Sequence, residues 1–466
     1  MKHLVFGFDL CDDTTQVSWC AAGLAEPEMV IFGEGDHPEQ IATAVCRLRG
    51  EKDWVVGEDA ARAALFGTGS IVDKLTKMVA KDGTATMEGI RYTAEDLMFA
   101  FLDTVLRTSM TYAKARLEDQ TEGESEETAE PVPAPAEPEI PAPQPFDFSA
   151  LERLVFTVPS LDRKLLDVLM RCCAKLGIEK ERVMIRSHGE SFACYTASQK
   201  LDIWANDVGL FDLSRDGLRF FRFRCVRGGK PGLLQVRENY LEESFSLDLL
   251  DTESGRKLAD SILTPCAERM LAGNVYSAVL LSGSGFSECE SWATGFLKTV
   301  CTRRRVFMTE GVFAKGAALC GFDSLQKTTH FPYRFDTAGR VPLSVSVTGL
   351  RKGSPVKLTL IEEGSNWYEA VGRADLLVNG KDPLELIVEG NMRAGIPPRR
   401  IPVSLADFPV REGYTTRVAL TVSFRAEDVL LIEAEDLGFG RIFPATGTVS
   451  RQEAGISWNQ AERRAR

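Results

Sequence analysis

Two patterns of apolar and polar residues follow one another along the chain. In the first part, short apolar runs that predict buried strands alternate with stretches whose apolar residues recur at helical spacing. Strands are predicted at 154–158, 183–185, 208–212 and 276–281, and helices at 165–176, 256–271 and 286–300. This repeated order of strand and helix predicts an α/β domain made of residues 1–117 and 148–325.

The ends of two predicted helices carry capping residues. Thr93 and Asp96 resemble a capping box, in which each side chain bonds to the backbone N–H of the other, and a helix is expected from there to about Leu117. Gly177 follows the last apolar position of the helix predicted at 165–176, a place where glycine often ends a helix.

From residue 341 the period of the pattern changes to two. Apolar residues alternate at 343–347, 356–360, 384–388 and 418–424, with turn signals between these stretches. The pattern predicts a compact antiparallel β domain at 341–450, preceded by a linker at 326–340 and followed by a tail at 451–466. We expect no helical lid, because the tail is too short for a helical subdomain.

Composition and charge narrow the class of protein. Hydrophobic residues make up 44% of the chain and charged residues 26%, which is typical of soluble globular proteins. Residues 118–147 hold ten acids, no Lys or Arg, and seven prolines, so this stretch is predicted to be a disordered acidic insertion. Its acids account for ten of the twelve net negative charges, and the remaining charge of −2 gives no basic surface for nucleic acid.

The eleven cysteines show no C-x-x-C spacing, so a zinc site is not predicted. Those in apolar contexts are expected to be buried thiols in a reducing compartment: Cys20, Cys46, Cys194, Cys301 and Cys320. The N-terminal apolar run is too short for a signal peptide, and no stretch of eighteen apolar residues occurs. We therefore expect a cytoplasmic protein without a membrane partner.

Acids and glycines stand where several predicted strands end. Asp9 and Asp212 each end a strand, Glu190 begins a helix, and Gly283, Ser284 and Gly285 follow the strand at 276–281. In open α/β sheets, ligands bind at the carboxyl ends of the strands, where acids hold metals and glycines let backbone N–H groups approach phosphates. An acid at such a place can equally cap a turn or a helix.

The order of these segments resembles that of a known family, the DnaK-type heat-shock chaperones of the actin-like ATPase superfamily. The motifs are F-G-F-D-L at 6–10, V-G-E-D-A at 56–60, F-T-V-P at 156–159 with G-E-S-F-A at 189–193, F-D-L at 211–213, and L-S-G-S-G at 281–285 with E-G-V-F-A-K-G-A-A at 310–318. V-P-L-S-V at 341–345 and L-L-I-E-A-E-D at 430–436 continue the resemblance into the β domain. It implies a two-lobed actin-like ATPase domain followed by a β-sandwich similar to the chaperone's peptide-binding domain.

The resemblance also implies a site for ATP and Mg²⁺. Glu190 matches the glutamate that orients water, Asp212 a second catalytic acid, and Asp9 and Asp212 would hold Mg²⁺ through water. Lys74 or Lys77 matches the catalytic lysine. The positions that match nucleotide-binding segments are Asp9, Asp12, Asp13, Thr14, Thr15, Gly283, Ser284 and Gly285.

Two phosphate motifs depart from the family pattern. Cys11 replaces a glycine, Asp12 and Asp13 replace hydroxyl residues, and 214–216 replaces a run of glycines. Each acid would repel a phosphate, with about 4 kcal/mol per pair of unit charges at 4 Å and an effective dielectric of about 20. The segment between Asp212 and Gly283 is also shorter than the corresponding segment of the family. Its basic residues predict a strand with a solvated face or, alternatively, a partner-binding edge: Arg219, Arg222, Arg224, Arg227 and Lys230.

Three functions follow from the sequence. The first is a degenerate DnaK-like module that binds a peptide or protein partner through the β domain without using nucleotide. The second is an ATP-dependent chaperone or actin-like ATPase with divergent phosphate loops. The third is a protein that binds nucleotide without useful turnover, so enzymatic activity is left open.

Overall fold

The computed structural model describes residues 4–24, 26–34, 36–50, 54–122, 146–379, 384–390, 397–411 and 413–456. Most of the predicted insertion, residues 123–145, and the end of the predicted tail, residues 457–466, lie outside the described residues. The chain forms two compact units. The first consists of Met1–Cys225 and Val236–Pro332, and the second of Val226–Gln235 and Tyr333–Arg466.

The first unit contains a mixed sheet built around strand β1, and we call this part lobe I. β1 pairs in parallel with β10 and antiparallel with β2, and β11 lies parallel to β10. The strands predicted at 154–158 and 183–185 are confirmed. The strands of this sheet are β11 (Val183–Ser187), β10 (Leu151–Val158), β1 (Leu4–Leu10), β2 (Thr14–Ala21), β3 (Glu28–Met29) and β4 (Gln40–Ala42).

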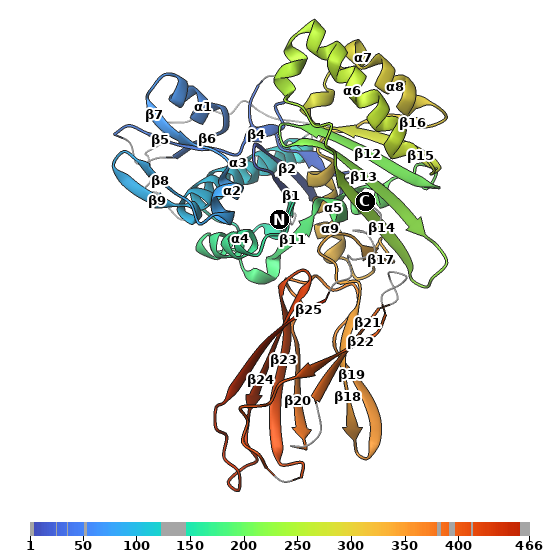
Figure 1. The fold of residues 1–466 in the computed structure, drawn as a ribbon. Helices are drawn as coiled ribbons and strands as arrows, with labels where there is room; N and C mark the ends of the chain where they lie inside the picture. Colours follow the sequence, from blue (N-terminus) through green and yellow to red (C-terminus); the bar gives the residue numbers. More distant parts are fainter. Residues whose placement is uncertain are drawn as a thin grey trace. The chain divides into compact units, whose positions relative to one another are not determined.

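A second sheet of the first unit forms lobe II. The strands predicted at 208–212 and 276–281 lie within it, in the order β16 (Arg305–Met308), β15 (Tyr276–Ser282), β12 (Asp207–Ser214), β13 (Gly217–Val226) and β14 (Gly232–Tyr240). Helices α6 (Glu253–Leu271), α7 (Cys289–Trp292) and α8 (Thr294–Cys301) gather on one side of it (Figure 1). Phe211 and Phe220 of the sheet pack with Leu263 and Phe296 of these helices in one buried core.

Helices α5 (His188–Ser198) and α9 (Val312–Ser324) connect the two lobes. Phe192 of α5 and Phe313 of α9 both contact Phe221 of β13, while α9 also packs on β1. Two glycines allow this close packing. A Cβ atom at Gly7 would lie 2.0 Å from the carbonyl oxygen of Ala314, and one at Gly316 would lie 1.9 Å from that of Ser191.

The capping residues predicted at two helix ends are confirmed. Thr93 N–H donates to Asp96 Oδ2 at 2.9 Å and Asp96 N–H donates to Thr93 Oγ1 at 3.2 Å, the reciprocal bonds of a capping box. Helix α3 (Ala94–Glu122) continues five residues beyond the expected Leu117. Helix α4 (Arg163–Lys175) is followed by Gly177 at a φ of +76°, which glycine adopts without strain.

The remaining elements of lobe I are short. Three strands form one small sheet, and a two-stranded ribbon precedes helix α3. They are β5 (Val45–Leu48), β6 (Trp54–Val56), α1 (Gly57–Leu65), β7 (Gly69–Val72), α2 (Leu75–Ala80), β8 (Thr84–Met87) and β9 (Ile90–Thr93).

One helix prediction is wrong. The helix expected at 286–300 is divided into α7 and α8, because Ala293 leaves helical geometry at φ −95° and ψ 47°. The carboxylate of Asp260 in α6 then accepts hydrogen bonds from the N–H groups of Gly295 and Phe296, both at 2.8 Å. The side chain of Asp260, from another helix, therefore caps the start of α8, although the apolar pattern of the sequence continues across the break.

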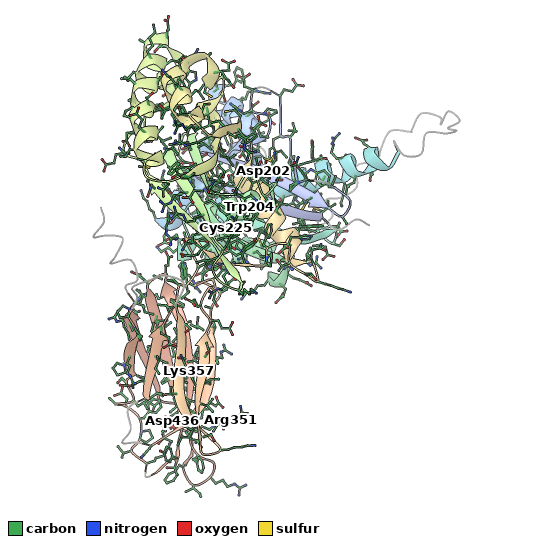
Figure 2. All side chains as sticks on the ribbon, turned by 90° about the vertical axis from the view of Figure 1, so that its right-hand side faces the viewer. Asp202, Trp204, Cys225, Arg351, Lys357 and Asp436 are labelled. Atoms are coloured by element: carbon green, nitrogen blue, oxygen red, sulfur yellow. The ribbon has the colours of Figure 1, made fainter. Side chains whose placement is uncertain are left out.

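The second unit contains two four-stranded antiparallel sheets. Their alternation is confirmed in β23, where Val418, Leu420, Val422 and Phe424 are buried. Figure 2 places Arg351, Lys357 and Asp436 in this unit. The strands are β19 (Ser354–Ile361), β18 (Ser344–Arg351), β21 (Leu384–Glu389) and β22 (Arg399–Val403) in one sheet, and β20 (Gly372–Val378), β23 (Thr416–Ala426), β24 (Val429–Asp436) and β25 (Val449–Gly455) in the other.

The edges of the second unit differ from the predicted boundaries. Strand β25 passes residue 450, so the β structure includes part of the predicted tail. Strand β17 (Tyr333–Asp336) lies in the predicted linker and pairs in parallel with residues 232–235 of β14, which belong to the same unit.

The cysteines are free thiols, and eight of the eleven are buried. The prediction is wrong for Cys301, which is exposed at the end of α8, and Cys320 is only half-buried. No helix in the described part of the chain is long and apolar enough to cross a membrane.

Candidate functional site

Asp9 and Asp212, the two acids expected to hold Mg²⁺, are linked by two basic side chains. His188 Nε2 lies 2.7 Å from Asp9 Oδ1, and Arg219 Nη1 lies 2.8 Å from His188 Nδ1. Arg219 Nη2 donates to Asp212 Oδ2 at 2.7 Å. All four residues are at least 95% buried, and their side chains form a continuous chain of hydrogen bonds from lobe I to lobe II. We call it the Asp9–Asp212 chain.

The contacts of His188 determine its tautomer. A guanidinium only donates hydrogen bonds, so Nδ1 of His188 accepts from Arg219 and carries no proton. The proton is therefore on Nε2 and is donated to Asp9. The imidazole also stacks on Phe313, with ring centroids 4.0 Å apart, which fixes its plane.

Arg219 is the centre of this site, contrary to its prediction as part of a solvated face. It is 2% exposed, lies over the rings of Phe221 and Phe313, and has Glu238 Oε1 3.6 Å from Nη1. Burial alone lowers the pKa of the guanidinium, but the facing negative charges, Asp212 first, raise it overall. Burial raises the pKa of Glu238, and Arg219 offsets only part of this effect.

The cause of this burial is the register of a hairpin. β12 and β13 are joined by the two-residue turn Arg215-Asp216, with Ser214 opposite Gly217, so that Asp212 stands directly opposite Arg219. β13 is buried on both faces over residues 218–221, and a charged residue there needs a partner. The cross-strand carboxylate supplies it.

Glu190 also has an internal basic partner. It lies in the first turn of α5, where Ser187 caps the helix by accepting from the Glu190 N–H at 3.2 Å. Arg186 Nε is 2.9 Å from Glu190 Oε1, and both side chains are more than 90% buried. The carboxylate expected to orient water is thus already engaged in an ion pair.

Asp12 is tied to helix α2. Its Oδ1 accepts from Thr76 Oγ1 at 2.5 Å and from the Lys77 N–H at 3.1 Å, and Lys77 Nζ forms an ion pair with Oδ2. Of the two candidate lysines, Lys77 therefore reaches the site, whereas Lys74 is exposed in left-handed geometry at φ 53°. The ammonium group of Lys77 is thus already paired with the Asp12 carboxylate.

Asp13 lies in the turn between β1 and β2, where its carbonyl oxygen accepts from the Thr43 N–H at 3.0 Å. The other predicted residues have packing roles. Thr14 and Thr15 begin β2, and Thr15 Oγ1 bonds to Thr43 Oγ1 at 2.9 Å. A Cβ atom at Gly283, whose φ is +92°, would lie 2.2 Å from the carbonyl oxygen of Leu213. One at Gly285 would lie 2.4 Å from the Leu213 side chain. Close approach to β12 thus explains both glycines, and Ser284 begins a single 3₁₀ turn between them.

Asp9, Cys11 and His188 form a possible metal-ligand group among the described residues. Cys11 Sγ lies 3.5 Å from Asp9 Oδ1 and 3.8 Å from His188 Nε2. In this arrangement the donors do not fit a cation, because Nε2 of His188 carries the proton that it donates to Asp9 and offers no lone pair to a metal ion. The positive Arg219 beside His188 would also repel a metal ion, and Mg²⁺ between Asp9 and Asp212 meets the same charge.

The same geometry argues against a thiol nucleophile. A base that activates Cys11 would use one nitrogen for the thiol and the other for an orienting acid. Here Cys11 and Asp9 face the same nitrogen, Nε2.

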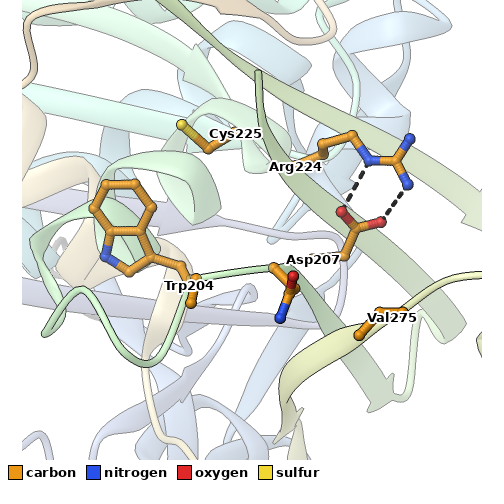
Figure 3. Close-up of a pocket in the computed structure, with 7 residues that line it drawn as sticks. Trp204, Asp207, Arg224, Cys225 and Val275 are labelled. Atoms are coloured by element: carbon orange, nitrogen blue, oxygen red, sulfur yellow. Dashed lines mark hydrogen bonds and ion pairs between the residues drawn. The ribbon is translucent and has the colours of Figure 1, made fainter. Parts of the chain in front are cut away.

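A separate pocket of about 270 Å³ opens at the other end of the β12–β13 hairpin. Figure 3 shows Trp204, Asp207, Arg224, Cys225 and Val275 around it. Arg224 donates to both oxygens of Asp207, at 2.8 and 2.6 Å, and to Asn274 Oδ1 at 2.8 Å. The Arg224 guanidinium at this pocket is therefore already paired with Asp207, as Arg219 is with Asp212.

Two family models match the chain. One, described as "Family of unknown function (DUF5716) C-terminal", matches residues 26–120 and 142–337. The other, described as "Domain of unknown function (DUF8552)", matches residues 340–456. A search of curated proteins finds none that matches.

Proposed function

The chain belongs to the DUF5716 family of unknown function, and from its own site we propose that it is a DnaK-like binding or scaffolding module that works without nucleotide. One observation carries this proposal. Asp9, Asp212, Glu190 and Asp12 are each bonded to a basic side chain of the protein itself: His188, Arg219, Arg186 and Lys77.

These internal bases act against nucleotide binding in two ways. Mg-ATP would have to displace Arg219 from Asp212 before a hydrated Mg²⁺ could approach, and the buried guanidinium would lose its closest acid partner. Breaking a buried ion pair by removing one partner costs about 3–5 kcal/mol. Asp12 and Asp13 add charge of the same sign as the phosphates, so the binding energy would have to exceed both costs.

The second unit offers a surface for a peptide or protein partner. β19 is the edge strand of its sheet and is exposed along most of its length, with Val356 and Leu358 on one face. An exposed edge pairs with an extended segment through main-chain hydrogen bonds, and apolar side chains beside it add specificity. The free thiols fit a reducing, cytoplasmic environment.

The first test is the thermal midpoint of the purified protein with and without millimolar Mg-ATP. A ligand at about a hundred times its dissociation constant adds about 2.7 kcal/mol, which shifts the midpoint by a few degrees. We expect no shift. A shift, together with Mg²⁺-dependent hydrolysis that Glu190→Gln lowers at least tenfold, would favour the ATP-dependent chaperone or actin-like ATPase instead.

The second test concerns the β19 edge. Fluorescent extended peptides with apolar residues are titrated against the full chain, and we expect Leu358→Lys to weaken their binding at least tenfold. Thr359→Lys is the matched control, because it adds the same charge to the opposite face of the same strand. Equal affinity of Leu358→Lys and the unaltered chain would exclude this surface.

A further inference from the structure

The two lobes bring together a serine, a histidine and a glutamate, none of which belongs to the Asp9–Asp212 chain. Ser287 Oγ, from the segment between β15 and α7, lies 2.9 Å from His37 Nε2, which precedes β4. On the other side of the ring, His37 Nδ1 lies 3.7 Å from Glu39 Oε1. A serine, a histidine and an acid in this order catalyse acyl transfer in several unrelated folds.

This group has the arrangement that the Cys11 group lacks. The hydroxyl faces one ring nitrogen of His37, and the acid faces the other. The carboxylate of Glu39 favours a proton on Nδ1, which leaves the lone pair of Nε2 for the Ser287 hydroxyl. The 3.7 Å between Nδ1 and Oε1 is in the range of an ion pair, and such contacts are often long in enzymes without substrate.

A four-residue turn in lobe I holds the histidine and the glutamate. The Gln40 N–H donates to the His37 carbonyl oxygen at 3.0 Å, and Pro38 stands at the second position, which favours proline. The Pro38 carbonyl oxygen accepts from the Phe32 N–H at 2.8 Å, so the preceding loop is closed as well. Gln40 Nε2 donates to Glu39 Oε1 at 3.3 Å. Because Glu39 is 5% exposed, little water screens its charge.

The backbone on both sides of Ser287 is fixed in lobe II. Its N–H donates to the Ser284 carbonyl oxygen at 3.2 Å, and its own carbonyl oxygen accepts from Trp292 Nε1 at 3.4 Å. Phe286, the residue before it, is fully buried. Glu288, the residue after it, has a φ of +50°, which residues other than glycine rarely adopt. This backbone holds the hydroxyl in place against His37.

Both reacting side chains can be reached from solvent. Ser287 is partly exposed, and the His37 side chain keeps 32% of its surface exposed. The segments that carry them also carry four exposed acids: Glu34, Asp36, Glu288 and Glu290. Their charges repel an anionic substrate, so the site suits an uncharged ester.

We propose that Ser287, His37 and Glu39 form a hydrolytic site for uncharged carboxylic esters. Ser287 Oγ bonds to the acyl carbon, the bond from that carbon to the alcohol oxygen breaks, and the serine proton passes through His37 Nε2 to the leaving alcohol. Water then attacks the acyl-serine, returns a proton through His37 to Ser287 Oγ, and releases the carboxylic acid. Glu39 positions the imidazole. This activity goes beyond the proposed binding role and does not depend on it.

The first test is covalent labelling of the full chain with a fluorophosphonate probe, in which the oxygen of an activated serine replaces fluoride on phosphorus. Peptide mass spectrometry should place the label on Ser287, and both Ser287→Ala and His37→Gln should lose it. Ser291→Ala and His330→Gln are the matched controls and should keep it. Ser291 is exposed and donates to the Glu288 carbonyl oxygen, and His330 is also exposed.

The second test measures hydrolysis of p-nitrophenyl acetate, an uncharged ester. Ser287→Ala and His37→Gln should each lower kcat/KM about tenfold or more. Glu39→Gln should lower kcat about tenfold with KM and the thermal midpoint unchanged, because a positioning residue acts in the transition state. The anionic ester 4-acetoxy-3-nitrobenzoate should react more slowly than p-nitrophenyl acetate, each rate taken relative to spontaneous hydrolysis.

Three results would overturn the proposal. The first is a probe that leaves Ser287 unlabelled under conditions that label a known serine hydrolase. The second is labelling or hydrolysis that persists undiminished in both Ser287→Ala and His37→Gln. The third is an equal or faster relative rate for the anionic ester, which would contradict the proposed substrate class.

Discussion

An Arg–Asp pair is buried in each unit of the protein, Arg219–Asp212 in the first and Arg411–Asp436 in the second, and these two pairs are built differently. In the second unit, Arg411 donates to both oxygens of Asp436, at 2.7 and 2.9 Å. Asp436 also accepts from Gly438 N–H at 3.1 Å, and from the N–H and hydroxyl of Thr446 at 3.0 and 2.7 Å. In the first unit, Arg219 donates hydrogen bonds to Asp212 and His188 and forms a longer ion pair, at 3.6 Å, with Glu238.

This difference separates a pair whose carboxylate has a full set of donors from a pair whose cation is shared among several partners. The carboxylate of Asp436 has its full set of donors and closes the segment 436–446 onto β24. The guanidinium of Arg219 instead faces two carboxylates, those of Asp212 and Glu238, with its single positive charge. When every acceptor site of a buried carboxylate has a donor, the loss of one donor leaves the others in place. When one cation is shared among several acids, the loss of any partner changes the net charge of the buried site.

The largest expected effect is that of Arg219→Met. The change leaves Asp212 buried without its cation, so the free energy of unfolding of the first unit should fall by about 3–5 kcal/mol. Calorimetry that resolves the two units is the measurement, because one transition cannot be assumed for both. Arg222→Met, three residues along the same strand, should cost about 0.5 kcal/mol or less. Equal effects would mean that the pairing with Asp212 is energetically unimportant.

A smaller effect is expected for Asp436→Asn. The change removes the charge but keeps an acceptor oxygen, and the second unit should lose about 2–3 kcal/mol. Arg411, followed by the donors of Thr446 and Gly438, lowers the pKa of Asp436, so its contribution is present at neutral pH and is lost as the pH falls below about 4.

The pH profile provides the decisive comparison for this prediction. Acid should destabilise the unaltered second unit more than the Asp436→Asn variant. Asp375→Asn, which removes the exposed partner of Arg417, is the control and should change stability by about 0.5 kcal/mol or less. Parallel acid profiles for all three proteins would contradict the assigned role of Asp436.

The smallest effect is expected for Thr446→Val. It removes one hydroxyl donor from Asp436 and should lower the stability of the second unit by about 1 kcal/mol. Thr359→Val in the exposed edge strand β19 is the matched control and should be neutral or slightly stabilising, since valine favours strands. A Thr446→Val variant as stable as its control would show that the carboxylate is satisfied without this donor.

Local patterns predicted most of the secondary structure. The alternation of Val418 and Leu420, the apolar run of β10 and the capping box at Thr93 each depend on neighbours in sequence, and each is confirmed. The break between α7 and α8 could not be predicted in this way, because Asp260 reaches it from another helix.

The candidate site was predicted only in part. The places of Asp9 and Asp212 at strand ends predict them, but the alternating pattern assigns Arg219 to a solvated face or a partner-binding edge, because alternation does not show that both faces of β13 are buried. The hairpin register carried a usable signal: with Arg215-Asp216 as a two-residue turn, Asp212 must stand opposite Arg219. The contact of His188 with Asp9 joins residues 179 positions apart, and no local pattern reports it.

The strand pairing of β17 has a practical consequence for any work on fragments. Its partner residues, 232–235, belong to the second unit but are encoded within the stretch that otherwise makes the first. A fragment that starts at residue 333 would therefore carry β17 without its partner and leave a row of unsatisfied peptide groups. The two units cannot be separated by one cut, and a permuted or fused gene would have to carry residues 226–235 along with the β sheets.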